Sequence, residues 1–166
     1  MKKEDYKIPF RGLGAGAHAF GFEIDEEFFK GEDLLDVKKG AASVSVDMIK
    51  EATLMDLHFR LKGTLRLVCE RCLSEYDQPF EGEFRLIVKF GETFDEESDE
   101  VVTIPRTESN LNVGGYIYEY VNLLLPIKKA HEHIEDCDQE MIGKIEAHEQ
   151  QNADPRWDAL KKLKLK

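Results

Sequence analysis

Two cysteines stand close together in the segment "LVCERCL", where Cys69 and Cys72 follow an alternating apolar run. A Cys-x-x-Cys turn brings two sulfur atoms within reach of one tetrahedral metal ion. The same spacing occurs in redox-active dithiols, but these place the first cysteine at the start of a helix. No helix pattern opens at Cys69, so the spacing favours a metal clamp over a redox pair.

A metal held by this pair needs further ligands, and the chain has one more cysteine. Cys137 ends the segment "HEHIEDC", which also holds His131 and His133. Three cysteines and one histidine form a recognised structural zinc set. The residues themselves leave two questions open. Either histidine could be the fourth ligand, and the cysteines could instead be buried thiols that hold no metal. We predict a structural zinc site.

Alternation with period two dominates the first hundred residues and predicts strands with one buried face. It is clearest at Met55, Leu57 and Phe59, and again at Phe84, Leu86, Val88 and Phe90, where polar residues such as Arg85 and Lys89 lie between the apolar ones. Turn residues at Lys39-Gly40, Lys62-Gly63, Asp77 to Pro79 and Gly91 suggest a meander of five to seven antiparallel strands. Ile87, apolar on the outer face, suggests that the helix at 115–125 covers that face. The acidic segment "ETFDEESDE" at 92–100 is expected to be a solvated loop.

The apolar period then changes to that of a helix. Ile117, Tyr120, Val121 and Leu124 follow helical spacing, and Pro126 ends the pattern. A weaker helix pattern covers 140–152. In "DPRWDALKKL", an aspartate cap and a proline at the first helical position predict a short C-terminal helix. The predicted fold class is α+β: a mainly antiparallel, partly closed sheet with one main amphipathic helix. We predict one domain at 1–153 and a basic tail at 154–166.

The charge distribution separates this tail from the rest of the chain. The net charge is −11, yet five basic residues and one acid follow residue 155, which leaves −15 on residues 1–155. So acidic a body argues against a broad nucleic-acid-binding surface. No apolar stretch approaches the roughly 20 residues of a membrane helix, and the N-terminus lacks the apolar segment of a secretory signal. We therefore expect a cytosolic protein without a membrane partner.

Three features occur in an order that resembles the YceD family, the large ribosomal RNA subunit accumulation proteins. They are "CERCL" after a strand, "GGYIYEYVNLLLPIKKAH" before the last cysteine, and "DPRWDALKKL" at the end. The resemblance covers the chain from about residue 42 onward. It aligns the family's histidine best with His131, which makes His133 the alternative ligand. Many members carry additional cysteines after the Leu-Pro helix, whereas this chain has only Cys137.

The resemblance implies a non-enzymatic role in the synthesis, processing or stability of large-subunit ribosomal RNA. The implied partners are a large-subunit ribosomal protein, precursor rRNA or both, with no small-molecule substrate. An acidic body suits a basic ribosomal protein, and the tail offers RNA-binding candidates: Arg156, Trp157, Lys161, Lys162, Lys164 and Lys166. No catalytic constellation stands out. The alternative is a zinc-dependent hydrolase or nuclease, with Glu70 or Glu132 as general base.

Overall fold

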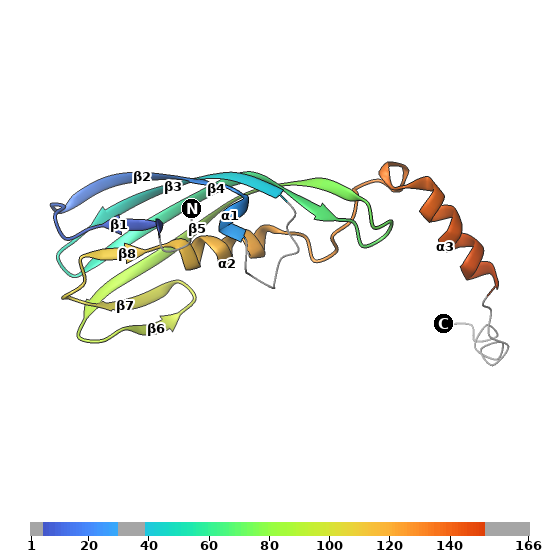
Figure 1. Ribbon diagram of the computed structural model, residues 1–166. Coiled ribbons are helices and arrows are strands. Elements are labelled where there is room, and N and C mark those ends of the chain that lie inside the picture. The colour runs from blue at the N-terminus through green and yellow to red at the C-terminus, as the bar shows by residue number, and fades with distance from the viewer. Residues whose placement is uncertain (1–4, 30–38, 152–166) are drawn as a thin grey trace, which may run out of the picture. The chain divides into compact units, whose positions relative to one another are not determined.

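The computed structural model describes residues 5–29 and 39–151, and the statements below concern these residues. They form eight strands, three α-helices and a 3-10 turn (Figure 1). The strands are β1 (Lys7–Pro9), β2 (Gly16–Ile24), β3 (Lys39–Lys50), β4 (Leu54–Val68), β5 (Glu75–Gly91), β6 (Asp95–Ser98), β7 (Val101–Pro105) and β8 (Asn110–Asn112). The α-helices are α1 (Glu26–Phe29), α2 (Gly114–Leu124) and α3 (Gln139–Gln151), and the 3-10 turn is η2 (Ile134–Asp136).

The chain divides into two compact units, which are treated separately here. The sheet unit comprises the described residues of Met1–Leu67 and Asp77–Ile127. The cysteine unit comprises those of Val68–Tyr76 and Lys128–Lys166. The tail predicted at 154–166, with Trp157 and the basic residues around it, lies outside the described residues. The predicted boundary at residue 154 therefore stays a prediction.

The α+β class predicted from the sequence is confirmed, with a different strand order. β2, β3, β4 and β5 follow one another in the sheet as in the chain, which is a meander. β7 then lies beside β5 and runs parallel to it, with β6 outside β7. β1 and β8 pair separately. β2 and β6 are the two edge strands of the large sheet and do not pair with each other, so the expected partial closure is not confirmed.

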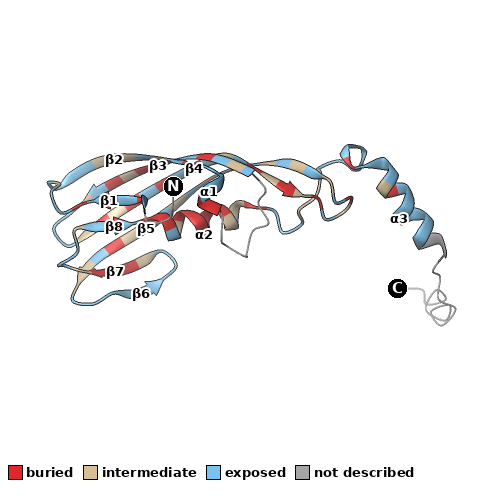
Figure 2. Ribbon diagram, in the orientation of Figure 1, coloured by how far each residue is buried: buried red, intermediate tan, exposed pale blue. Residues whose placement is uncertain are grey.

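Period-two burial holds along the central strands, as Figure 2 shows by alternating colours on β3 and β4. Met55, Leu57 and Phe59 are fully buried on one face of β4. On β5, Leu86 and Val88 are also fully buried, as the alternation predicts. Burying such side chains contributes about 1.5–3 kcal/mol each. The strand pattern of the sequence therefore locates the main core correctly.

Helix α2 covers this buried face of the sheet. The Tyr120 ring stacks on Phe84 with centroids 4.2 Å apart and meets the Phe59 ring edge-on at 5.3 Å. Phe84 and Phe59 both belong to the inward set of the alternation. The expectation that the helix covers the face of Ile87 is therefore wrong, because α2 packs on the opposite face. Ile87 is instead half-buried in the ladder with Val101 of β7.

Three of the expected turns are strand interiors. Gly40 and Gly63 lie within β3 and β4, where a side chain on either glycine would meet the neighbouring strand. A glycine inside a strand often marks such a close approach rather than a turn. Pro79 lies within β5, at a point beyond the stretch that pairs with β7, so its missing N–H breaks no bond on that side. Only Gly91 ends a strand as expected.

The acidic segment at 92–100 is more ordered than the expected solvated loop. Its residues Asp95–Ser98 form β6, the exposed edge strand that pairs with β7. Charged residues on an edge strand disfavour pairing with another chain. Lys89 of β5 forms an ion pair with Glu97 at 2.7 Å, which ties the hairpin to the sheet.

Candidate metal centre

Residues 69–73 form a tight turn that presents both sulfur atoms of the Cys-x-x-Cys pair. The Leu73 N–H donates to the Cys69 carbonyl, and the Cys69 N–H donates to the Ser74 carbonyl, both at 2.8 Å. Leu73 has a φ of +62°, a left-handed conformation that costs a leucine about 1–2 kcal/mol. The turn therefore holds an unfavourable backbone conformation at Leu73, the residue directly after the second cysteine.

A second segment of the cysteine unit brings the remaining donors. The Glu70 N–H donates to the Lys129 carbonyl at 2.7 Å, which joins the turn to the residues just before His131. η2 follows, and the Cys137 N–H donates to the Ile134 carbonyl at 3.1 Å. Local sequence thus positions each half, while one long-range backbone bond aligns them.

Helix α3 begins directly after Cys137 and is capped by an aspartate. The Asp138 carboxylate accepts bonds from the backbone N–H groups of Glu140 at 2.9 Å and Met141 at 3.1 Å. Such capping contributes about 1 kcal/mol to a helix. Ile142, one turn into the helix, is buried against the three cysteines. The weak helix pattern of the sequence is therefore a real helix, and its start is fixed beside the candidate metal centre.

The four donors predicted from the sequence come together. Cys69, Cys72, His131 and Cys137 each offer one donor atom, and all four atoms lie within 4.8 Å of one another. The three sulfur atoms are buried and the imidazole is half-buried. His133 is exposed and is not part of this group, so the geometry favours His131 of the two histidines left open by the sequence.

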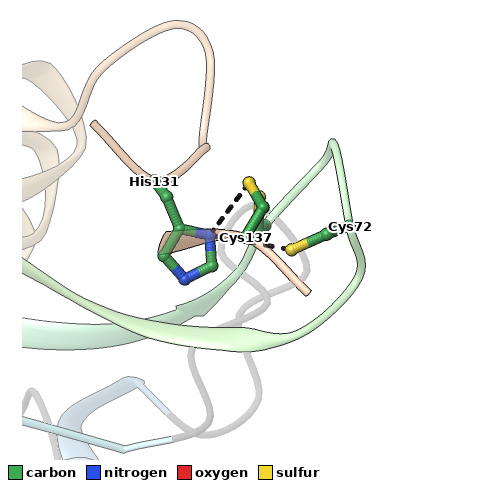
Figure 3. Close-up of side chains that lie close together, drawn as sticks. Cys72, His131 and Cys137 are labelled. Atoms are coloured by element: carbon green, nitrogen blue, oxygen red, sulfur yellow. Dashed lines mark hydrogen bonds between the residues drawn. The ribbon is translucent and has the colours of Figure 1, made fainter. Parts of the chain in front are cut away.

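Two distances from His131 match those between two ligands of one zinc ion. His131 Nδ1 lies 3.7 Å from Cys72 Sγ and 3.6 Å from Cys137 Sγ (Figure 3). Zinc bonds of about 2.3 Å to sulfur and 2.0–2.1 Å to nitrogen, at tetrahedral angles, separate a sulfur and a nitrogen ligand by about 3.6 Å. Both sulfur–nitrogen distances are thus compatible with a tetrahedral ion, and every other donor pair lies within 4.8 Å.

The hydrogen bonds around the sulfur atoms favour the thiolate form that a metal requires. Burial raises the pKa of Cys69, but backbone N–H groups of Cys72, His131 and Arg71 outweigh it and lower that pKa to about 7. Burial also opposes ionisation of Cys72, whose pKa is nevertheless lowered, chiefly by the Ser74 hydroxyl, 3.0 Å from its sulfur.

Cys137 differs from the other two thiols. Burial raises its pKa, and the neighbouring sulfur atoms raise it further, although the Arg71 guanidinium donates to its sulfur at 3.4 Å and acts in the opposite direction. Three thiolates would repel one another here, and a divalent cation between them would remove that repulsion. The arrangement therefore suits a bound metal better than three free thiolates.

Three neighbours of the site were not among the sequence predictions: Arg71, Ser74 and Tyr76. The first two lie within or directly after the Cys-x-x-Cys turn, so their proximity could have been predicted from position alone. Tyr76 packs its ring against His131 with centroids 5.0 Å apart. That contact required the fold, because the two residues are 55 positions apart in the chain with a helix between them.

Comparison with family models identifies the chain's relatives. The model described as large ribosomal RNA subunit accumulation protein YceD matches residues 57–164. The chain belongs to the YceD family. The match includes both segments of the candidate metal centre and starts at residue 57, later than the start near residue 42 that the sequence motifs suggest. Comparisons with curated proteins and with solved structures gave no match. No helix among those described is long and apolar enough to cross a membrane.

Proposed function

We propose that this YceD-family protein is a non-enzymatic cytoplasmic assembly factor for the large ribosomal subunit. Its membership of a family described by large ribosomal RNA subunit accumulation carries this proposal. In this role it binds a basic large-subunit ribosomal protein, precursor rRNA or both. The net charge of −11 favours the ribosomal protein, since electrostatic complementarity speeds association and selects basic partners.

The candidate metal centre fits a structural zinc ion within this proposal. Cys69, Cys72, His131 and Cys137 are its proposed ligands, and the spacing of their donor atoms supports the assignment. Bound zinc supplies cross-linking of the two segments and not reaction chemistry. Four protein donors fill a tetrahedral site, whereas catalytic zinc keeps one position open. The spacing thus favours an assembly factor over the alternative zinc-dependent hydrolase or nuclease.

The proposed function is tested by affinity purification of the tagged full-length protein from cells under mild salt conditions. Sequencing of co-purified RNA and mass spectrometry of co-purified protein should both show enrichment of large-subunit components. Precursor rRNA ends should be enriched over mature ends. Enrichment of neither large-subunit rRNA nor a large-subunit ribosomal protein over a mock purification would contradict the proposal.

The basic tail is expected to strengthen binding to precursor particles. Deleting residues 154–166, or changing Lys161, Lys162, Lys164 and Lys166 together to glutamine, should reduce co-sedimentation with precursor large subunits several-fold. The reason is that each contact between a lysine and a phosphate releases counterions from the RNA, which favours binding, and each lost contact removes this contribution. Raising the salt concentration should weaken the binding of the intact protein to precursor particles in the same way. Trp157→Ala serves as the comparison: a loss of thermal stability with normal binding would mean that the tail only packs.

Arg71 is expected to stabilise the metal centre through its bond to Cys137. Three thiolates and a neutral imidazole around Zn²⁺ carry one net negative charge, and the guanidinium offsets it at the Cys137 sulfur. Arg71→Met should therefore weaken zinc affinity about tenfold or more, as measured by competition with a chromogenic chelator. The neighbouring exposed Glu70→Gln is the matched control and should retain wild-type affinity. Equal zinc affinity in both variants would show that Arg71 has no such role.

A further inference from the structure

A hollow of about 340 Å³ lies in the sheet unit. It forms where the turn after β1, the turn between β3 and β4, and the segment after β7 meet the end of β5. Phe10, Arg11, Lys50, Phe90 and Arg106 are among the residues that line it. Its volume falls in the range of pockets that hold small ligands or single units of larger ones.

The walls of the hollow are fixed by backbone hydrogen bonds between these segments. The Arg106 N–H donates to the Gly91 carbonyl at 3.1 Å, and the Arg11 N–H donates to the Ser109 carbonyl at 3.3 Å. The Lys50 ammonium donates to the carbonyl of Phe10 at 2.8 Å. The backbone at these positions is therefore held before any ligand arrives, which lowers the entropy cost of ordering the segments on binding.

The two arginines of the hollow differ from the other arginines that the structure describes. Arg60, Arg66 and Arg85 each form an ion pair with an aspartate of the sheet, at 2.6–2.8 Å. Arg71 donates to a cysteine sulfur. For Arg11 and Arg106, by contrast, no side-chain hydrogen bond or ion pair is found among the described residues, and both are exposed. The two unpaired guanidinium groups of the described chain thus line the same hollow.

The floor of the hollow is aromatic. The rings of Phe10 and Phe90 lie with centroids 5.6 Å apart and planes inclined by 36°. Phe10 is buried, whereas Phe90 keeps part of its surface exposed. Cationic groups beside an accessible aromatic face are the combination by which proteins hold single-stranded nucleic acid, through phosphate contacts and base stacking.

We propose that this hollow binds one nucleotide unit of single-stranded RNA. Arg11 and Arg106 contact the phosphates, and Phe90 stacks on the base. The lining carries three cations against Glu51 and Glu108, a local charge of +1 in a chain of net charge −11. An RNA strand is therefore repelled by most of the protein and accepted at this hollow. The inference rests on the proposed assembly function and names the point at which the folded body meets RNA.

The test measures binding of a single-stranded RNA to the full-length protein. The RNA has 12 nucleotides and a fluorescein label, and its fluorescence anisotropy reports binding over a range of salt concentrations. Changing Arg11 and Arg106 together to glutamine should weaken binding tenfold or more and reduce the salt slope by about 1.4, since each of the two single-strand phosphate contacts contributes about 0.7. Phe90→Leu should weaken binding about fivefold or more at an unchanged salt slope. Glu51→Gln should strengthen it.

Arg60→Gln is the matched control, because Arg60 is an exposed arginine already paired with Asp47. It should bind RNA like the wild type, and thermal melting confirms that each variant is folded. Wild-type affinity in the double arginine variant would overturn the inference, as would equal competition by inorganic polyphosphate and by unlabelled RNA. Either outcome leaves the proposed function intact if the protein still co-purifies with precursor large subunits.

Discussion

Replacing Cys72 with serine is expected to abolish stoichiometric zinc binding and to unfold the cysteine unit while the sheet unit stays folded. The buried apolar cluster of this unit consists of three cysteines and Ile142, with Tyr76, Ala130 and Met141 partly buried against it. So small a core cannot by itself offset the entropy of ordering the chain. Structural zinc supplies about 10–16 kcal/mol in zinc-finger peptides, which exceeds what this cluster contributes.

Two measurements check this result. Elemental analysis of the purified protein should find about one zinc per chain in the wild type and almost none in Cys72→Ser. Hydrogen exchange should lose protection in helix α3 and retain it in strands β3 to β5. His133→Gln is the matched control, since this exposed histidine lies outside the donor cluster and its loss should change neither readout. Full zinc content together with unchanged exchange in Cys72→Ser would rule out the metal site.

The second large effect is expected at Gly63, in the interior of β4. Its partner across the ladder is Ala42 of β3. A Cβ atom on Gly63 would lie 2.4 Å from the Ala42 Cβ and 2.5 Å from the Ala41 carbonyl oxygen. These are backbone-bound atoms that no rotamer change can move, so the two strands would have to separate locally. Gly63→Ala should therefore destabilise the protein by about 3 kcal/mol, at the upper end of overpacking costs.

Urea unfolding, followed by far-ultraviolet circular dichroism, measures this loss of stability. Gly21→Ala in β2 is the matched control, because a Cβ there meets no atom within 4 Å. Its unfolding midpoint should stay at or slightly above that of the wild type, since alanine reduces the entropy of the unfolded chain. Equal midpoints for the two alanine variants would show that β3 and β4 are further apart at Gly63 than described here.

Local patterns in the sequence predict the elements with strong periodicity and the candidate donors of the metal centre. Alternation predicts the strands around Leu57 and Leu86, because successive side chains of a strand must face opposite sides. Helical spacing predicts α2, and the Cys-x-x-Cys turn predicts two sulfur donors, because both are local relations within a few residues. The types of Cys137, His131 and His133 supplied the remaining candidate donors, with either histidine possible.

Features that depend on distant partners emerge only in the folded chain. Gly63 reads as a turn residue until Ala42 is placed against it, and the parallel pairing of β7 with β5 breaks the antiparallel meander that the sequence predicts. The geometry favours His131 over His133, as the family resemblance also does, because a backbone bond between residues 70 and 129 aligns two segments far apart in the chain. Arg11 and Arg106, 95 positions apart, share a hollow only because the sheet brings their loops together. Such long-range pairings leave no periodic trace in one sequence, since their energy comes from packing between segments and not from local propensity.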